Sequence, residues 1–184
     1  MNRPIIDSEK DPILPIIDIV HGSMIKHDFE AVRDGLREIE NCVYNMIENE
    51  AFEETDEMKI LYLFEHLERV GILAVNMHDE YSIGAVIDTI FVLGKLAAKK
   101  RLEIITINAM ISLKKIGNIT AQQKLDDTTF WVIDSLGEIG LVASEQELAK
   151  ASKMVENYLQ EILKIAKVNE LEKTKQEAEN YINK

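Results

Sequence analysis

The sequence predicts an all-α protein of about eight helices, arranged as four stacked antiparallel helix pairs. Apolar residues recur at spacings of three and four almost throughout, as in Phe29, Val32, Leu36, Ile39 and Val43. This spacing is typical of amphipathic helices. Alternating Val- and Thr-rich runs bounded by Gly or Pro, which would indicate strands, are missing from the sequence. An internal 23-residue repeat is long enough for one helix and one turn.

We expect the first four helices near residues 12–25, 28–50, 57–77 and 81–99. The first helix has Asp11 as a candidate N-cap and Pro12 at its first position. Proline is tolerated there because the backbone N–H that it lacks would have no hydrogen-bond partner within the helix. Asp28 and Asp56 precede the next two apolar runs and are candidate N-caps as well. The fourth helix is placed by the repeat.

We expect the last four helices near residues 103–120, 127–143, 145–167 and 170–183. Asp127 is a candidate N-cap, and Ser144/Glu147 and Asn169/Glu172 have the spacing of a capping box. The alternative is one continuous helix over residues 145–183, which would protrude as a dimerisation arm. The repeat register favours a break near residues 167–170.

The repeat is clearest in a column of glycines. Val70-Gly71-x-x-Ala74, Leu93-Gly94-x-x-Ala97, Ile116-Gly117-x-x-Thr120 and Ile139-Gly140-x-x-Ala143 follow one another at this same 23-residue interval. Because glycine inside a helix costs about 1 kcal/mol relative to alanine, four in register predict a close helix crossing that larger side chains would obstruct. The copies are more similar to one another at twice this interval, so the structural unit is a helix pair. The register holds from Met58 onward, and the first two helices do not align in phase.

The helix pairs resemble HEAT and armadillo-type repeats. The turn Asp28-x-x-x-Val32-Arg33 carries the resemblance most clearly, with looser counterparts at Asp79 and Asp126. The resemblance covers roughly residues 12–183 and departs from the family pattern after Val86 and Val132, where Ile follows instead of Arg. It implies a scaffold that binds other proteins along one surface.

A second stretch, Asp18-Ile19-Val20 through Asp28-Phe29-Glu30-Ala31, resembles the soluble segment of a family of uncharacterised prokaryotic membrane proteins. The prolines of that family's pattern are missing from this sequence. This resemblance implies an alternative role as the cytosolic part of a membrane-associated assembly.

The charge distribution indicates which kind of partner the protein binds, and the cysteine content indicates its cellular compartment. Residues 1–92 hold 7 basic and 20 acidic side chains, whereas residues 93–184 hold 14 and 13. This acidic surface disfavours nucleic acid and suits a basic protein partner. Cys42 is the only cysteine, which fits a reducing cytoplasm. The longest charge-free stretch is the ten residues Ile104–Leu113, too short for a membrane span of about 18 residues, so we expect a cytoplasmic protein without direct membrane insertion.

Catalytic and metal-binding patterns are weak. Asp18-x-x-His21 places two potential ligands one helical turn apart, and His27-Asp28 lies at a turn. The Glu-x-x-His pairs of a di-iron bundle and the glycine-rich nucleotide motifs are missing from the sequence. We therefore expect a non-enzymatic protein without cofactor or metal. The alternative is a small-molecule or metal-binding helical bundle, with or without enzymatic activity, that uses Asp18, His21, His27 and Asp28.

The domain prediction is a flexible tail over residues 1–11 followed by a single helical repeat domain over residues 12–184. Asp88 and Asp134 occupy the same place in successive helix pairs, and helical geometry turns them away from the apolar stripe of Val86. They and Trp131 are the candidate interaction residues of a protein-binding or assembly module. The fourth and fifth helices are apolar on more than one side, which indicates either burial on two faces or a homodimer.

Overall fold

The computed structural model describes residues 13–49 and 51–183, so the tail predicted over residues 1–11 lies outside the described residues. These two ranges contain eight helices and no strand, which confirms the all-α class. The helices are α1 (Ile13–Ile25), α2 (Phe29–Glu48), α3 (Glu54–Asn76), α4 (Glu80–Lys99), α5 (Glu103–Gln122), α6 (Asp126–Glu145), α7 (Ala149–Asn169) and α8 (Glu172–Ile182).

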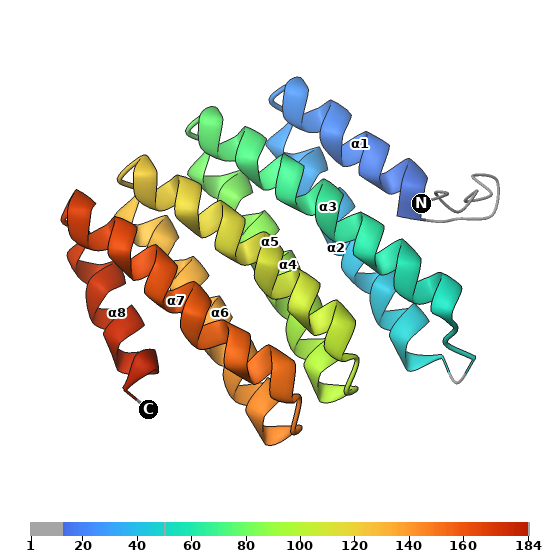
Figure 1. Cartoon of the computed structure of the whole chain (residues 1–184). Coiled ribbons are helices and arrows are strands. Elements are labelled where there is room, and N and C mark those ends of the chain that lie inside the picture. Colours follow the sequence, from blue (N-terminus) through green and yellow to red (C-terminus); the bar gives the residue numbers. More distant parts are fainter. Residues whose placement is uncertain (1–12, 50, 184) are drawn as a thin grey trace, which may run out of the picture.

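The helices form two layers. The odd-numbered helices α1, α3, α5 and α7 pack side by side in one layer, and the even-numbered helices α2, α4, α6 and α8 form the other (Figure 1). Each odd-numbered helix also packs against the even-numbered helix that follows it. The four stacked antiparallel pairs predicted from the repeat are therefore present, and the two termini lie at opposite ends of the stack.

Six turns of the same kind connect these helices. Each contains one residue with a left-handed backbone, φ between 55° and 62°. Five of these residues follow one another at the 23-residue interval of the repeat: His78, Arg101, Lys124, Glu147 and Glu170. The N–H of the next residue donates to a carbonyl five residues back, at 2.8–3.0 Å. This bond satisfies a carbonyl that the end of the helix would leave without a partner.

The turn geometry explains why the first two helices are out of phase with the repeat. The remaining left-handed residue, His27, precedes His78 by a 51-residue offset, which exceeds twice the repeat by five. Two of the extra five residues lengthen the connection between α2 and α3, and the other three lengthen α3, which has 23 residues where α5 has 20. The connection contains no left-handed residue in its described part. With this offset, the N-caps Asp28 and Asp79 also correspond, and each accepts a hydrogen bond from the backbone N–H three residues on.

Several predicted caps are wrong. The α6 helix continues through Ser144, and Glu147 has the left-handed backbone of the next turn. The α7 helix continues through Asn169, whose side chain donates to the Ala121 carbonyl of α5. Both capping boxes fail because the left-handed turn lies at those positions. The predicted break near residues 167–170 is confirmed, at the left-handed Glu170.

The candidate cap Asp11 lies outside the described residues, and the cap candidates Asp56 and Asp127 lie inside their helices. The α6 helix follows the N-cap Leu125, so Asp127 is its second residue. The α3 helix follows the N-cap Glu53, and Asp56 accepts a hydrogen bond from the Glu53 N–H as the third residue of a capping box. The tight turns thus use leucine as N-cap at α5, α6, α7 and α8.

The glycines stand where helices cross, as the repeat predicts. A β-carbon added to Gly94 would lie 2.7 Å from the β-carbon of Ala109 and 2.9 Å from Ile139. A β-carbon on Gly117 would lie 2.7 Å from Val132, a residue that again follows fifteen positions later. Real β-carbons do not approach so closely, so each glycine lets two helices come together.

The first helix pair makes the same crossing with the two roles exchanged. A β-carbon on Gly35 of α2 would lie 2.5 Å from Val20 of α1. With the 51-residue offset, Val20 corresponds to Gly71 and Gly35 corresponds to Val86, and Gly71 and Val86 face each other in the next pair. One small and one branched residue therefore meet at this crossing, and either helix can carry the small one.

The last helix is held by a carboxylate of α6. Asp126 accepts hydrogen bonds from the backbone N–H of Lys173 at 3.2 Å and of Thr174 at 3.0 Å, and from the Thr174 hydroxyl at 2.7 Å. Burial raises the pKa of the Asp126 carboxyl, but these hydrogen bonds outweigh burial and the net pKa is lowered. The neighbouring Asp127 pairs with the exposed Lys173 ammonium.

The central helix α4 is apolar enough, by length and composition, to cross a membrane. It also packs against α2, α3, α5 and α6, and it carries Asp88 and Lys95. A buried helix at the centre of a stack has the same composition. Most of the apolar side chains that favoured a homodimer are covered by the chain's own helices, although Val92 and Ile104 remain exposed, and a homodimer stays a prediction.

Substitution of Gly94 tests the crossing. We expect Gly94→Ala to lower the free energy of unfolding by about 1–3 kcal/mol because the added methyl overlaps Ala109. Gly22→Ala, in open space on α1, should instead raise it by up to about 1 kcal/mol. Adding Ala109→Gly to Gly94→Ala should restore part of the loss. Urea denaturation measures all three, and equal effects of the two alanines would contradict the crossing.

Substitution of Asp126 tests the attachment of α8. We expect Asp126→Ala to lower the free energy of unfolding by about 1–2 kcal/mol. The matched change Asp127→Ala should cost less than about 1 kcal/mol because its ion pair is exposed. Because the folded pKa of Asp126 is lowered, its contribution is present above pH 3.8 and is lost as the pH falls through the folded pKa. Faster amide exchange at Thr174 should accompany only the first substitution.

Candidate interaction groove on the even-numbered helices

An open groove of about 770 Å³ crosses the outer face of the even-numbered layer, and we call it the α2–α4–α6 groove. It lies over three successive helices of one layer. Its lining residues are Arg33, Leu36, Arg37 and Glu40 of α2, Glu80, Tyr81, Gly84, Ala85, Asp88, Thr89, Phe91 and Val92 of α4, and Trp131, Asp134 and Ser135 of α6.

Small residues on α4 create the hollow, and Trp131 forms one side of it. A β-carbon on Gly84 would lie 3.3 Å from the Trp131 ring, so the indole packs against the bare α4 backbone. Ala85 adds only a methyl group beside it. The Trp131 side chain nevertheless remains 47% exposed. An indole that is packed at its edge and open on the outside offers apolar area without having to reorganise.

Hydrogen bonds between neighbouring helices fix the polar side chains around the groove. The Arg33 guanidinium donates to the Tyr81 hydroxyl at 2.7 Å, which links α2 to α4. The Thr89 hydroxyl donates to Glu40 at 2.7 Å, about two helical turns further along the same two helices. Between α6 and α8, the Tyr181 hydroxyl donates to Asp134 at 2.9 Å. These bonds hold the walls of the groove at fixed positions.

Glu80 and Asp88 are the two acidic residues in the groove that these bonds leave out, and burial raises the pKa of Asp88. Within residues 13–49 and 51–183, the Asp88 carboxylate forms no hydrogen bond and no ion pair. The walls of the groove partly desolvate it, although the side chain is exposed overall. A partly desolvated carboxylate without a countercharge favours a cation that arrives from outside.

The three residues predicted for interaction, Asp88, Asp134 and Trp131, line this one groove. The two acids are exposed, as helical geometry predicted. Sequence reasoning missed Glu40 and Tyr81, and it assigned Arg33 only to the turn pattern. The α2 residues could not be placed opposite α4 because the five extra residues between α2 and α4 hide the register of the first pair.

The candidate metal ligands do not form a site. Asp28 caps α2, and His27 is the left-handed residue of the preceding turn. Asp18 and His21 are exposed on α1. Among the described residues, no three His, Cys, Asp or Glu side chains are grouped so that they could hold an ion. Burial is the main cause of the lowered pKa of the nearby His66, whose ring lies 4.4 Å from that of Tyr62 between centroids, at an interplanar angle of 59°.

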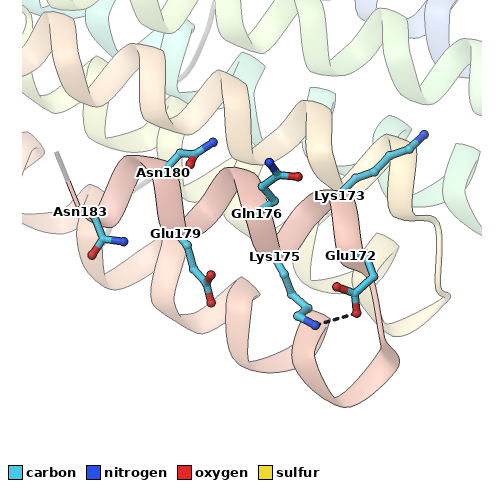
Figure 2. Close-up of a pocket in the computed structure, with 7 residues that line it drawn as sticks. All are labelled: Glu172, Lys173, Lys175, Gln176, Glu179, Asn180 and Asn183. Atoms are coloured by element: carbon cyan, nitrogen blue, oxygen red, sulfur yellow. Dashed lines mark hydrogen bonds and ion pairs between the residues drawn. The ribbon is translucent and has the colours of Figure 1, made fainter.

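A second hollow, of about 660 Å³, lies along the outer face of α8, and Figure 2 shows its lining. All seven lining residues come from this one helix and its C-terminal end, and Lys175 pairs with Glu172 at 2.7 Å across it. No second helix contributes to its lining. The last helix of a stack exposes its outer face to solvent, and polar residues on that face keep it soluble.

The comparisons with known proteins add no relative. No protein-family model, no curated protein and no solved structure matches the chain. The assignment of a function therefore rests on the groove and its chemistry.

Neutralising Asp88 tests whether its ionised carboxylate lowers the free energy of unfolding. Because its folded pKa is raised, the folded protein binds the proton more tightly than the unfolded chain, and the ionised carboxylate lowers stability at neutral pH. We expect Asp88→Asn to raise the free energy of unfolding at pH 7 by less than about 1 kcal/mol. The gain should vanish as the pH falls through the folded pKa. A loss of stability at pH 7 would show that Asp88 has a structural partner.

Proposed function

We propose that the chain is a non-enzymatic, HEAT-like helical repeat domain that acts in the cytoplasm by binding a segment of another protein in the α2–α4–α6 groove. The observation that carries the proposal is the half-exposed Trp131 beside Asp88 and Asp134, in a groove whose walls are fixed by hydrogen bonds. Exposed tryptophan on a rigid element is enriched at binding hot spots.

The architecture supports a binding role over a catalytic one. Stacked helix pairs give a stiff scaffold on which equivalent side chains of successive pairs, such as Asp88 and Asp134, lie on neighbouring helices of one layer. The groove runs over three such helices, long enough for an extended or helical segment. Two pairs of its polar residues bond to each other, Arg33 with Tyr81 and Glu40 with Thr89, and no acid–base pair converges on an enclosed cleft within the described part of the chain.

Affinity capture from the source organism's lysate tests this proposal. The wild-type chain is compared with a groove variant, Asp88→Arg/Asp134→Arg, and with a control variant, Glu65→Arg/Glu156→Arg. The control makes the same charge change on exposed residues of the odd-numbered helices α3 and α7. We expect at least one protein to bind the wild type and the control variant but not the groove variant.

The captured protein is then titrated with purified chain. Trp131 is the only tryptophan of this chain, so the change in emission, after subtraction of the partner's own fluorescence, reports occupancy of the groove. Circular dichroism checks that all three chains are folded. Recovery of the same proteins by the groove variant, or a partner whose binding leaves the Trp131 emission unchanged, would overturn the assignment to this groove.

A further inference from the structure

Two acidic residues of the groove lie next to the Trp131 ring, one on each of the helices α4 and α6. Gly84, whose backbone contacts the ring, and Asp88 are four residues apart on α4, so they share one face of that helix. Trp131 and Asp134 are three residues apart on α6 and share a face as well. All of them line the groove. Because α4 and α6 run in the same direction, both carboxylates lie about one helical turn beyond the contact between Gly84 and the indole, on the same side of the ring.

The arginines of the groove do not neutralise this cluster. Arg33 bonds to Tyr81 and pairs with Glu30 and Asp34 of its own helix. Arg37 pairs with Asp34 at 4.0 Å. Both stand on the α2 wall, whereas the indole belongs to the α6 wall. Neither arginine therefore neutralises the carboxylates of α4 and α6, and this side of the groove remains negatively charged.

A negative, partly desolvated rim beside an open aromatic ring is the chemistry that binds a cation. The ring attracts a guanidinium or ammonium group through its quadrupole, and a carboxylate next to it adds Coulomb attraction. An anionic or uncharged segment would cover Asp88 without supplying a countercharge, which is unfavourable. Charge complementarity thus selects one kind of occupant.

We propose that the Trp131 ring, together with the neighbouring carboxylates of Asp88 and Asp134, is a pocket for one arginine or lysine side chain of the partner protein. This inference rests on the proposed function and names the partner chemistry at the same site. The aliphatic stem of the side chain lies over Gly84 and Ala85, and its charged end sits between the two carboxylates.

A titration with single amino-acid probes tests the pocket without knowledge of the partner. N-acetylarginine amide and N-acetyllysine amide are added to the full chain while the indole N–H signal of Trp131 is followed by NMR. N-acetylcitrulline amide, which has the shape of arginine without its charge, is the control. We expect a saturable shift with both cations and none with citrulline. Asp88→Asn should weaken the binding about tenfold, and Glu65→Gln on α3 should leave it unchanged.

The outcomes separate the two proposals. No saturable shift with either cation up to about 100 mM, or equal shifts with arginine and citrulline, overturns the cation pocket. If the pocket fails in this way while lysate capture still depends on the groove, the proposed function stands with a different partner chemistry. If the cations bind but no captured protein depends on the groove, the pocket stands and the protein partner is withdrawn.

Discussion

The structure depends on how closely consecutive helices approach at their crossings. At Gly71, Gly94, Gly117 and Gly140, the backbone of one helix touches the side chain that follows fifteen positions later on the next helix. A single methyl group at such a point would force the helices apart. Gly71, Gly94 and Gly117 also each face an isoleucine of the next helix in their own layer. The same glycine therefore joins neighbouring helices of one layer. The crossing therefore fixes the pair and the stack together, with one glycine in each repeat.

The groove is a consequence of this stacking. Neighbouring even-numbered helices are brought side by side, so residues about two repeats apart in the chain meet, as in the bonds of Arg33 with Tyr81 and of Glu40 with Thr89. Gly84 lies outside the glycine column of the crossings, on the outer face of α4, where it lets the Trp131 ring rest on the backbone. The small residues on the inner face thus hold the helices together, and the small residues on the outer face leave room for a ligand. Asp88, a partly desolvated carboxylate there without a partner among the described residues, gains the most from binding a cation.

Much of this fold could be predicted from the sequence because its constraint is periodic. The glycine column predicted the crossings, and the 23-residue register predicted the break before α8. The capping boxes at Ser144 and Asn169 failed because a left-handed turn ends each helix later than a side-chain cap would. That turn leaves little trace in composition, since His, Arg, Lys and Glu occupy the left-handed position instead of glycine. The groove could be predicted only in part: Asp88 and Asp134 follow the register, whereas Arg33 and Glu40 lie on a helix that five extra residues move out of phase.

The central claim, that a glycine touches its facing residue at the five crossings of Gly35, Gly71, Gly94, Gly117 and Gly140, is tested most directly by nuclear Overhauser effects in the intact chain. The structure predicts cross-peaks from the α-protons of Gly94 to the Ala109 methyl group, of Gly117 to Val132 and of Gly140 to Val155. It also predicts a cross-peak from Gly35 backwards along the chain to Val20, because the first pair exchanges the two roles. Cross-peaks from these α-protons only to residues of their own helices would contradict the account.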